Sequence, residues 1–154
     1  MGGMLFAQAP EGDAASGKAI FEGKGDCVSC HRVKLTGSRS GPDLTTIGRE
    51  RRATPAYLER ALLDPDADVA RANRGVRVTL KKGGTVVTGR LLTRDMFTVE
   101  LMDSQGTIKS FLKSELSSVM IVTKGLMPSY KASLRPREIA DVVSYLRSLK
   151  GPGK

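Results

Sequence analysis

The sequence is poor in several residue types, and each shortage narrows what the chain can do. It has no tryptophan, only 5% aromatic residues, two cysteines and a single histidine among 154 residues. A serine or cysteine nucleophile with a histidine base would need that one histidine, which the motif described below already uses. No paired-carboxylate pattern stands out either, so we do not expect an enzyme. No run of 18 or more apolar residues occurs, so no stretch has the length of a membrane-spanning helix.

Positive charge, by contrast, is abundant. The chain has 25 lysines and arginines and 16 aspartates and glutamates, which gives a formal net charge of +9. This charge favours a negatively charged partner through long-range attraction, but acidic proteins, nucleic acids and anionic membranes all satisfy it. With 40% hydrophobic and 27% charged residues, the composition is that of a folded globular protein. The length allows one ordinary domain or two small ones.

Both cysteines and the histidine fall within one short motif, Cys27-Val28-Ser29-Cys30-His31. Two thiols three positions apart, followed directly by an imidazole, are typical of a covalent attachment site for c-type haem. The thiols can add to the two vinyl groups of the macrocycle, while the histidine ligates the iron. The motif therefore predicts one haem c, held by Cys27 and Cys30, with His31 as an iron ligand.

Other uses of these residues are less favoured. A structural zinc site needs four ligands from cysteine, histidine or carboxylate, and the chain has two cysteines and one histidine. A thioredoxin-like redox pair should end a strand in a βαβ pattern, whereas the residues before Cys27 look helical or looped. A plain disulfide is no better supported.

A histidine that ligates iron needs an acceptor for its other ring nitrogen, because this bond fixes the tautomer. Gly41-Pro42-Asp43-Leu44 lies in a loop-rich stretch after the motif. Taken alone it would be only a turn. After the haem motif, however, the Pro42 carbonyl becomes a candidate acceptor for His31, and we count Pro42 among the predicted cofactor-binding residues.

One histidine leaves the other axial position of the iron to a second protein ligand, a substrate or water. A methionine thioether is a soft ligand suited to that position, and the chain has six methionines. Met127 lies in a rigid, non-periodic loop over residues 125–130, so we predict that it ligates the iron. The others lie in the ragged start or in strand patterns, where methionine usually fills a core: they are Met1, Met4, Met96, Met102 and Met120.

Periodicity divides the chain into helical ends and a strand-rich middle. Helical spacing with capping residues is found over 13–24, 55–64 and 136–150. In the middle the spacing changes to two and tight turns separate five expected strands, at 76–80, 85–93, 97–102, 108–112 and 119–122. Residues 32–50 and 66–74 have the composition of loops. Five short strands at this spacing predict a small barrel.

The helical parts resemble a class I cytochrome c over roughly residues 13–70 and 124–150. The motifs that carry the resemblance are Gly17-Lys18-Ala19-Ile20-Phe21, the haem motif, residues 41–44, Met127-Pro128 and residues 141–146. The resemblance implies that both thiols form thioethers, that His31 and Met127 ligate the iron, and that the Pro42 carbonyl holds His31. It also implies that the first and last helices cross beside the haem, with Gly17 and Phe21 against the face of Val142, Tyr145 and Leu146.

The middle resembles an Sm-like barrel through residues 76–81, 89–91, 95–99 and Gly106. Its RNA-reading residues are poorly matched, since Phe97-Thr98 replaces the usual Met-Asn pair, and nucleic acid is not an expected partner. The predicted fold class is α+β: a mostly helical cytochrome c fold around one covalent haem, interrupted by a small five-stranded antiparallel Sm-like barrel. The expected parts are a leader remnant with linker (1–12), the first cytochrome part (13–72), the barrel (73–123), the second cytochrome part (124–150) and a tail (151–154).

These features favour an electron carrier, because an iron with His and Met ligands has no open position for chemistry. Residues 73–124 contain nine lysines and arginines against four aspartates and glutamates, which suits a redox partner with an acidic docking surface, and the barrel would serve docking or homo-oligomerisation. Two alternatives stay open. One is a haem-based sensor with an open or displaceable sixth position, and the other is an assembly protein whose barrels form a ring.

The first residues suggest where the protein works. Residues 4–10 resemble the tail of a signal peptide, with Ala7-Gln8-Ala9 in the small-x-small cleavage pattern. The charged region and most of the apolar region of such a peptide are missing. We expect a periplasmic or otherwise exported protein.

Overall fold

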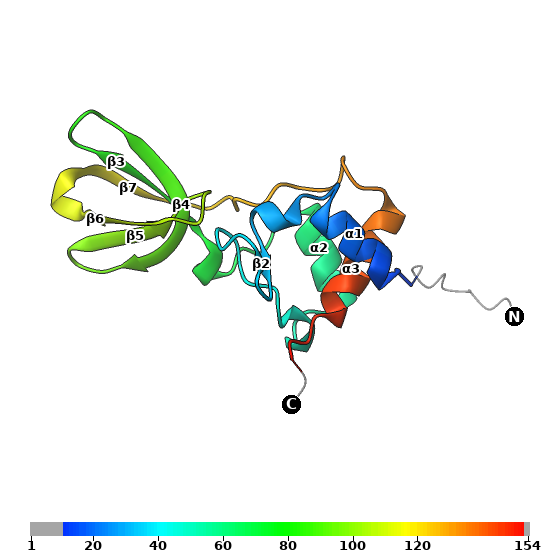
Figure 1. The fold of residues 1–154 in the computed structure, drawn as a ribbon. Helices are drawn as coiled ribbons and strands as arrows, with labels where there is room; N and C mark the ends of the chain where they lie inside the picture. The colour runs from blue at the N-terminus through cyan, green and yellow to red at the C-terminus, as the bar shows by residue number, and fades with distance from the viewer. Residues whose placement is uncertain (1–10, 153–154) are drawn as a thin grey trace, which may run out of the picture.

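The computed structural model describes residues 11–152 (Figure 1). Three α-helices gather on one side of the molecule, and a β-sheet projects from the other side. The predicted leader remnant over residues 4–10 lies outside the described residues, as do Met1 and Met4. Among the described residues, no helix combines the length and apolarity needed to cross a membrane.

Helix α1 (Ala14–Glu22) begins as the sequence predicted. The Asp13 carboxylate accepts a hydrogen bond from the Ser16 backbone N–H at 2.6 Å, which satisfies one of the free amides of the first turn. The helix ends at Gly23 instead of the predicted Gly25. Three residues, Lys24 to Asp26, therefore remain in which the chain turns before it reaches the cysteine motif.

Helix α3 (Pro136–Ser148) carries the apolar stripe that the sequence predicted. Its N-terminus has Arg135 where a serine or threonine would normally cap the helix, and the Glu138 carboxylate replaces that cap by accepting the Arg135 backbone N–H at 2.7 Å. The predicted stripe is buried: Ile139, Val142, Val143, Leu146 and Leu149.

Helices α1 and α3 lie side by side, in blue and red in Figure 1, and cross at Gly17. A Cβ atom on Gly17 would lie 1.9 Å from the Asp141 carbonyl oxygen, so only glycine allows this approach. One turn later, the Phe21 and Tyr145 rings meet edge to face with centroids 5.4 Å apart. The crossing implied by the cytochrome c resemblance is confirmed.

Helix α2 (Pro55–Leu63) completes the helical part. Thr54 accepts from the Tyr57 N–H at 3.2 Å, and Leu58 and Leu62 enter the core, as predicted. Residues 32–50, predicted as loop, instead form a small hairpin of β1 (Arg32–Val33) and β2 (Thr36–Gly37) and a short 3₁₀ turn at Ile47–Arg49. Strands of two residues leave no periodic pattern, so the sequence could not show them.

The middle of the chain forms the five predicted strands. They are β3 (Gly75–Leu80), β4 (Val86–Arg94), β5 (Thr98–Met102), β6 (Ile108–Leu112) and β7 (Leu116–Val122). All neighbours are antiparallel, in the order β6-β5-β4-β3-β7. The predicted closed barrel is not confirmed, because within the described residues no hydrogen-bonded ladder joins β6 to β7.

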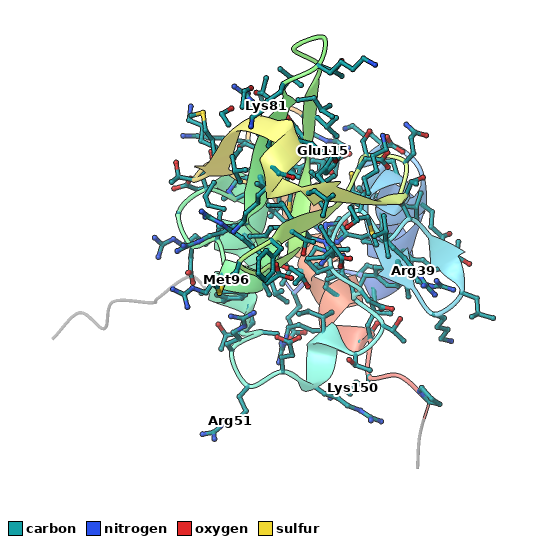
Figure 2. All side chains as sticks on the ribbon, turned by 90° about the vertical axis from the view of Figure 1, so that its left-hand side faces the viewer. Arg39, Arg51, Lys81, Met96, Glu115 and Lys150 are labelled. Atoms are coloured by element: carbon teal, nitrogen blue, oxygen red, sulfur yellow. The ribbon has the colours of Figure 1, made fainter. Side chains whose placement is uncertain are left out.

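The sheet has a core of its own. Val76, Val78, Val99, Leu101 and Leu116 are buried on its inner face, apart from the helical core. A tight 3₁₀ turn at Lys113–Glu115 connects the two edge strands, and the Lys81 backbone N–H donates to the Glu115 carbonyl at 2.8 Å. Figure 2, viewed from the sheet, shows Lys81 and Glu115 together at one end and charged side chains around the strands.

Candidate haem-binding site

One cavity of about 640 Å³ lies between the helical part and the sheet. All five residues predicted to bind the cofactor line it: Cys27, Cys30, His31, Pro42 and Met127. They come from positions up to a hundred residues apart in the chain, so the fold brings together what the sequence pattern only suggested. Cavities of this size hold small organic ligands.

The turn after α1 presents the two cysteines. Asp26 has a positive φ of 47° and starts a 3₁₀ turn over Cys27–Ser29. The His31 N–H donates to the Cys27 carbonyl at 2.7 Å, which keeps the motif compact. Neither thiol is in a disulfide; the Cys27 side chain is buried and the Cys30 side chain is exposed.

His31 has the tautomer that an iron ligand needs. Its Nδ1 lies 2.9 Å from the Pro42 carbonyl oxygen, and since a carbonyl can only accept, Nδ1 carries the proton and Nε2 keeps its lone pair. Burial lowers the pKa of His31, an effect that the Pro42 bond partly opposes, so the imidazole is held neutral. Gly41 packs against the ring, because a Cβ there would lie 3.0 Å from His31 Cε1.

Tyr130 is a site residue that the sequence reasoning missed. Its hydroxyl donates to the Gly25 carbonyl at 2.8 Å and lies 3.7 Å from the Cys27 Sγ. Burial raises the pKa of both the Cys27 thiol and the Tyr130 hydroxyl, so both stay protonated at neutral pH. The sequence offered one signal, because Tyr130 lies only three residues after Met127. A tyrosine buried beside a binding site usually finds a hydrogen-bond partner there.

The Met127 loop is fastened to the end of α2. The Tyr130 N–H donates to the Leu62 carbonyl at 2.9 Å, and the Ser129 hydroxyl donates to the Leu63 carbonyl at 2.6 Å. Met127 is partly buried and packs against the helical core while it lines the cavity. The loop is therefore fixed on the helix that forms part of the same cavity.

Met102 does not fill the core of the sheet, as its strand pattern had suggested. It is 7% exposed, yet it belongs to neither hydrophobic core. Side chains alternate along a strand; Val99 and Leu101 point inward, so Met102 points out of the sheet and lines the cavity. Other cavity-lining residues of the sheet and its turns, also missed by sequence, are Thr88, Gly89, Arg90, Asp103 and Ser104.

The other interpretations of the cysteine motif find no support in the described residues. Within residues 11–152, no three His, Cys, Asp or Glu side chains are grouped so that they could hold a metal ion, and zinc would need four ligands. The element before Cys27 is a helix, whereas a thioredoxin-like pair would follow a strand.

The residues of the cavity fit a haem. They supply a neutral imidazole whose Nδ1 is already engaged, two free thiols and a thioether. The remaining wall includes apolar and aromatic side chains such as Tyr57, Ala61 and Leu126. A c-type haem site requires donors of these kinds.

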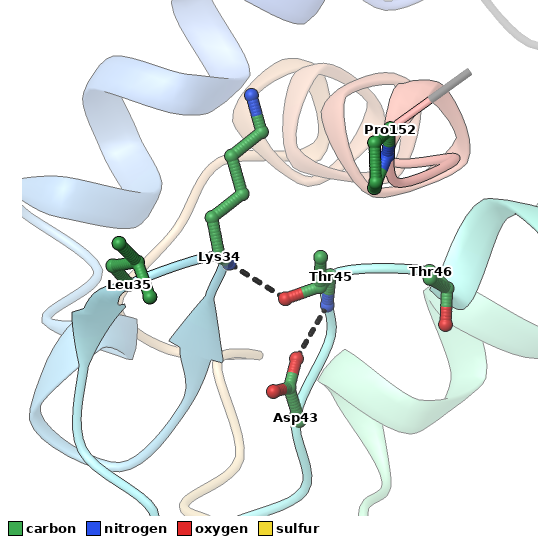
Figure 3. A pocket seen from close by; sticks show the side chains of 6 residues that line it. All are labelled: Lys34, Leu35, Asp43, Thr45, Thr46 and Pro152. Carbon is green, nitrogen blue, oxygen red and sulfur yellow. Dashed lines mark hydrogen bonds between the residues drawn. The ribbon is translucent and has the colours of Figure 1, made fainter. Parts of the chain in front are cut away.

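A second hollow, of about 600 Å³, is more open (Figure 3). Its walls carry no cysteine, histidine or methionine; they are Lys34, Leu35, Asp43, Thr45, Thr46 and Pro152. Two hydrogen bonds within the chain engage some of its polar groups: Thr45 Oγ1 accepts from the Lys34 N–H, and the Thr45 N–H donates to Asp43 Oδ1. We assign no binding role to this hollow.

Comparison with known proteins finds similarity to cytochrome c over part of the chain. Residues 14–83 match the family model described as Cytochrome c, a range that includes α1, the haem motif, α2 and β3 but leaves α3 outside. Over 54 residues the chain is 43% identical to cytochrome c of Sesamum indicum and 44% identical to cytochrome c of Guizotia abyssinica. Each match covers 34% of this chain and 47% of the relative. The chain thus spans about half the length of the curated relatives it matches, and its first half carries a cytochrome c-like segment.

Proposed function

We propose that the protein is a mono-haem c-type cytochrome that transfers electrons. The observation that carries the proposal is the hydrogen bond between His31 Nδ1 and the Pro42 carbonyl, directly after two free thiols in a segment that matches cytochrome c. A haem bound there supplies a one-electron couple between ferric and ferrous iron. The residues around it bind, orient and enclose that group.

Each predicted site residue has a role in this proposal. Cys27 and Cys30 would hold a haem by adding sulfur and hydrogen across its two vinyl groups, an addition that needs no external oxidant or reductant. His31 would bind the iron through Nε2, since the Pro42 carbonyl keeps the proton on Nδ1. Met127 would be the second protein ligand of the iron, and a thioether there would favour the ferrous state and raise the reduction potential.

The sheet serves interaction in this proposal. We propose the predicted boundaries, with residues 73–123 as an inserted unit between the two cytochrome parts. Its eight lysines and arginines against four acidic residues suit a redox partner with an acidic surface, and its edge strands β6 and β7 offer a route to homo-oligomers. Because c-type haem is attached outside the cytoplasm, the proposal places the protein in the periplasm or another exported compartment.

The test is the optical spectrum of exported, haem-loaded protein in both oxidation states, alongside Met127→Ala. We expect a low-spin spectrum with a sulfur-to-ferric-iron charge-transfer band that disappears in Met127→Ala. Met120→Ala is the matched control, because Met120 is 58% exposed on β7, and this variant should keep the band. A high-spin spectrum that responds readily to small ligands would contradict the carrier and favour a haem-based sensor.

A further inference from the structure

Arg90 joins the sheet to the loop that precedes Pro42. It lies in the middle of β4, where it pairs with Met102 of β5. Its Nε donates to the Ser40 carbonyl and one Nη2 N–H donates to the Arg39 carbonyl, both at 3.0 Å. A planar guanidinium that binds two successive carbonyls fixes their orientation in a way that one flexible amine cannot.

The same loop determines where His31 lies. The Gly41 N–H donates to the Cys30 carbonyl at 2.7 Å, and the next residue, Pro42, supplies the acceptor of His31 Nδ1. A short backbone path therefore connects the guanidinium of Arg90 to the ring of His31. The turn between β5 and β6 lies close to the same loop, since a Cβ on Gly106 would lie 3.5 Å from Ser38 Oγ.

The charge of Arg90 is also placed at the cavity. Among the described residues that line it, Arg90 is the only lysine or arginine, whereas Asp26, Asp68 and Asp103 are acidic. Its side chain is half-buried, which reduces screening of its charge by solvent. No described residue accepts a hydrogen bond from its Nη1. The guanidinium of Arg90 therefore places a positive charge on the wall of the cavity that the sheet provides.

We propose that the sheet is part of the haem site and that Arg90 is the positioning residue through which it acts, holding residues 39–42 and placing one positive charge beside the haem. This inference rests on the proposed function. Ferric haem carries one more positive charge than ferrous haem, so a nearby cation favours the ferrous form and raises the reduction potential. The sheet would then adjust the potential of the haem as well as meet partners.

The test compares Arg90→Gln with Arg94→Gln, which removes the same charge from an exposed position at the end of the same strand. Two quantities are measured on the full chain: the reduction potential of the haem-loaded protein and amide hydrogen exchange over residues 38–42. For Arg90→Gln we expect faster exchange in that loop and a lower potential, with the equilibrium constant for reduction falling roughly tenfold, the order of one charge across a partly buried site. Arg94→Gln should change neither, and Arg90→Lys should recover most of the potential but only part of the exchange protection.

Equal behaviour of Arg90→Gln and Arg94→Gln in both measurements would overturn the proposal. Failure of the proposed function and failure of the role of Arg90 give different results. If the exported chain carries no haem, the proposed function fails at the spectrum, while hydrogen exchange still tests whether Arg90 holds the loop. If the haem is present and the potentials of the two variants are equal, only the role of Arg90 at the haem is lost.

Discussion

Glu138 is the residue at which charge most clearly stabilises the helical part. Its carboxylate accepts the Arg135 backbone N–H at 2.7 Å, both of its oxygens lie 3.0 Å from Lys24 Nζ, and Arg135 Nη2 lies 3.3 Å away. These donors lower the pKa of Glu138 to about 2, with the Arg135 backbone bond as the largest cause. One side chain therefore caps α3 and links it to Lys24 beyond the end of α1.

The effect of Glu138 on stability should depend on pH. Because its pKa is lower in the folded than in the unfolded chain, its stabilisation is complete above the ordinary pKa of 4.5 and is lost as the pH falls towards 2. Glu138→Gln should lower the melting temperature at pH 7, and the difference from the unchanged protein should shrink between pH 4.5 and pH 2. Thermal unfolding of both proteins between pH 7 and pH 2 measures this difference in melting temperature. Glu59→Gln, on the exposed face of α2, controls for the loss of one negative charge, and a difference for Glu138→Gln that is constant with pH would contradict the account.

At the scale of elements, the crossing of α1 and α3 depends on a missing side chain. Gly17→Ala would place a Cβ 1.9 Å from the Asp141 carbonyl oxygen and 2.9 Å from Tyr145 Cβ. The two helices would have to separate, which should cost about 1–3 kcal/mol of unfolding free energy, although alanine is the better helix former by about 1 kcal/mol. Denaturant unfolding measures the change. Ser16→Ala, at an exposed position of α1, should change stability by less than about 0.5 kcal/mol, and a stabilised Gly17→Ala would refute the close crossing.

The elements that sequence predicted well have local signals. Asp13 and the Thr54-Pro55 pair determine where α1 and α2 begin through bonds within one turn. The five strands follow from alternation and tight turns. Whether the sheet closes could not be predicted, because pairing between β6 and β7 depends on curvature summed over all the strands rather than on any one segment.

The site residues also divide into those with a local sequence signal and those that only packing brings together. The motif from Cys27 to His31 is contiguous, so the sequence alone carries the prediction of its chemistry. The contact of His31 with the Pro42 carbonyl, predicted from the need of the histidine for an acceptor, is present. Tyr130 meets Cys27 from 103 positions away, and Arg90 meets Ser40 from 50 positions away. Contacts at such separations follow from the packing of the two parts, which no local pattern reveals.

At the scale of the whole molecule, the chain passes twice between the helical part and the sheet (Figure 1). Residues of both parts line the cavity. The ends of the described chain both belong to the helical part, so the sheet extends away from them. A sheet of this kind, inserted between the cysteine motif and Met127, would be in a position to bind the proposed partner and to influence the proposed haem at the same time. The two roles proposed for the sheet are docking and adjustment of the reduction potential. Both follow from its position beside the cavity and away from the chain ends.

The central claim is that Cys27 and Cys30 bind one haem covalently. The most direct measurement is the intact mass, under denaturing conditions, of the chain exported from a host that attaches c-type haem, alongside the double variant Cys27→Ala, Cys30→Ala. We predict that the unchanged chain is heavier than its polypeptide by one haem, with no thiol left to alkylate, and that the double variant has the polypeptide mass alone. An unmodified chain with two alkylatable thiols, in a host that loads other c-type cytochromes, would contradict the account.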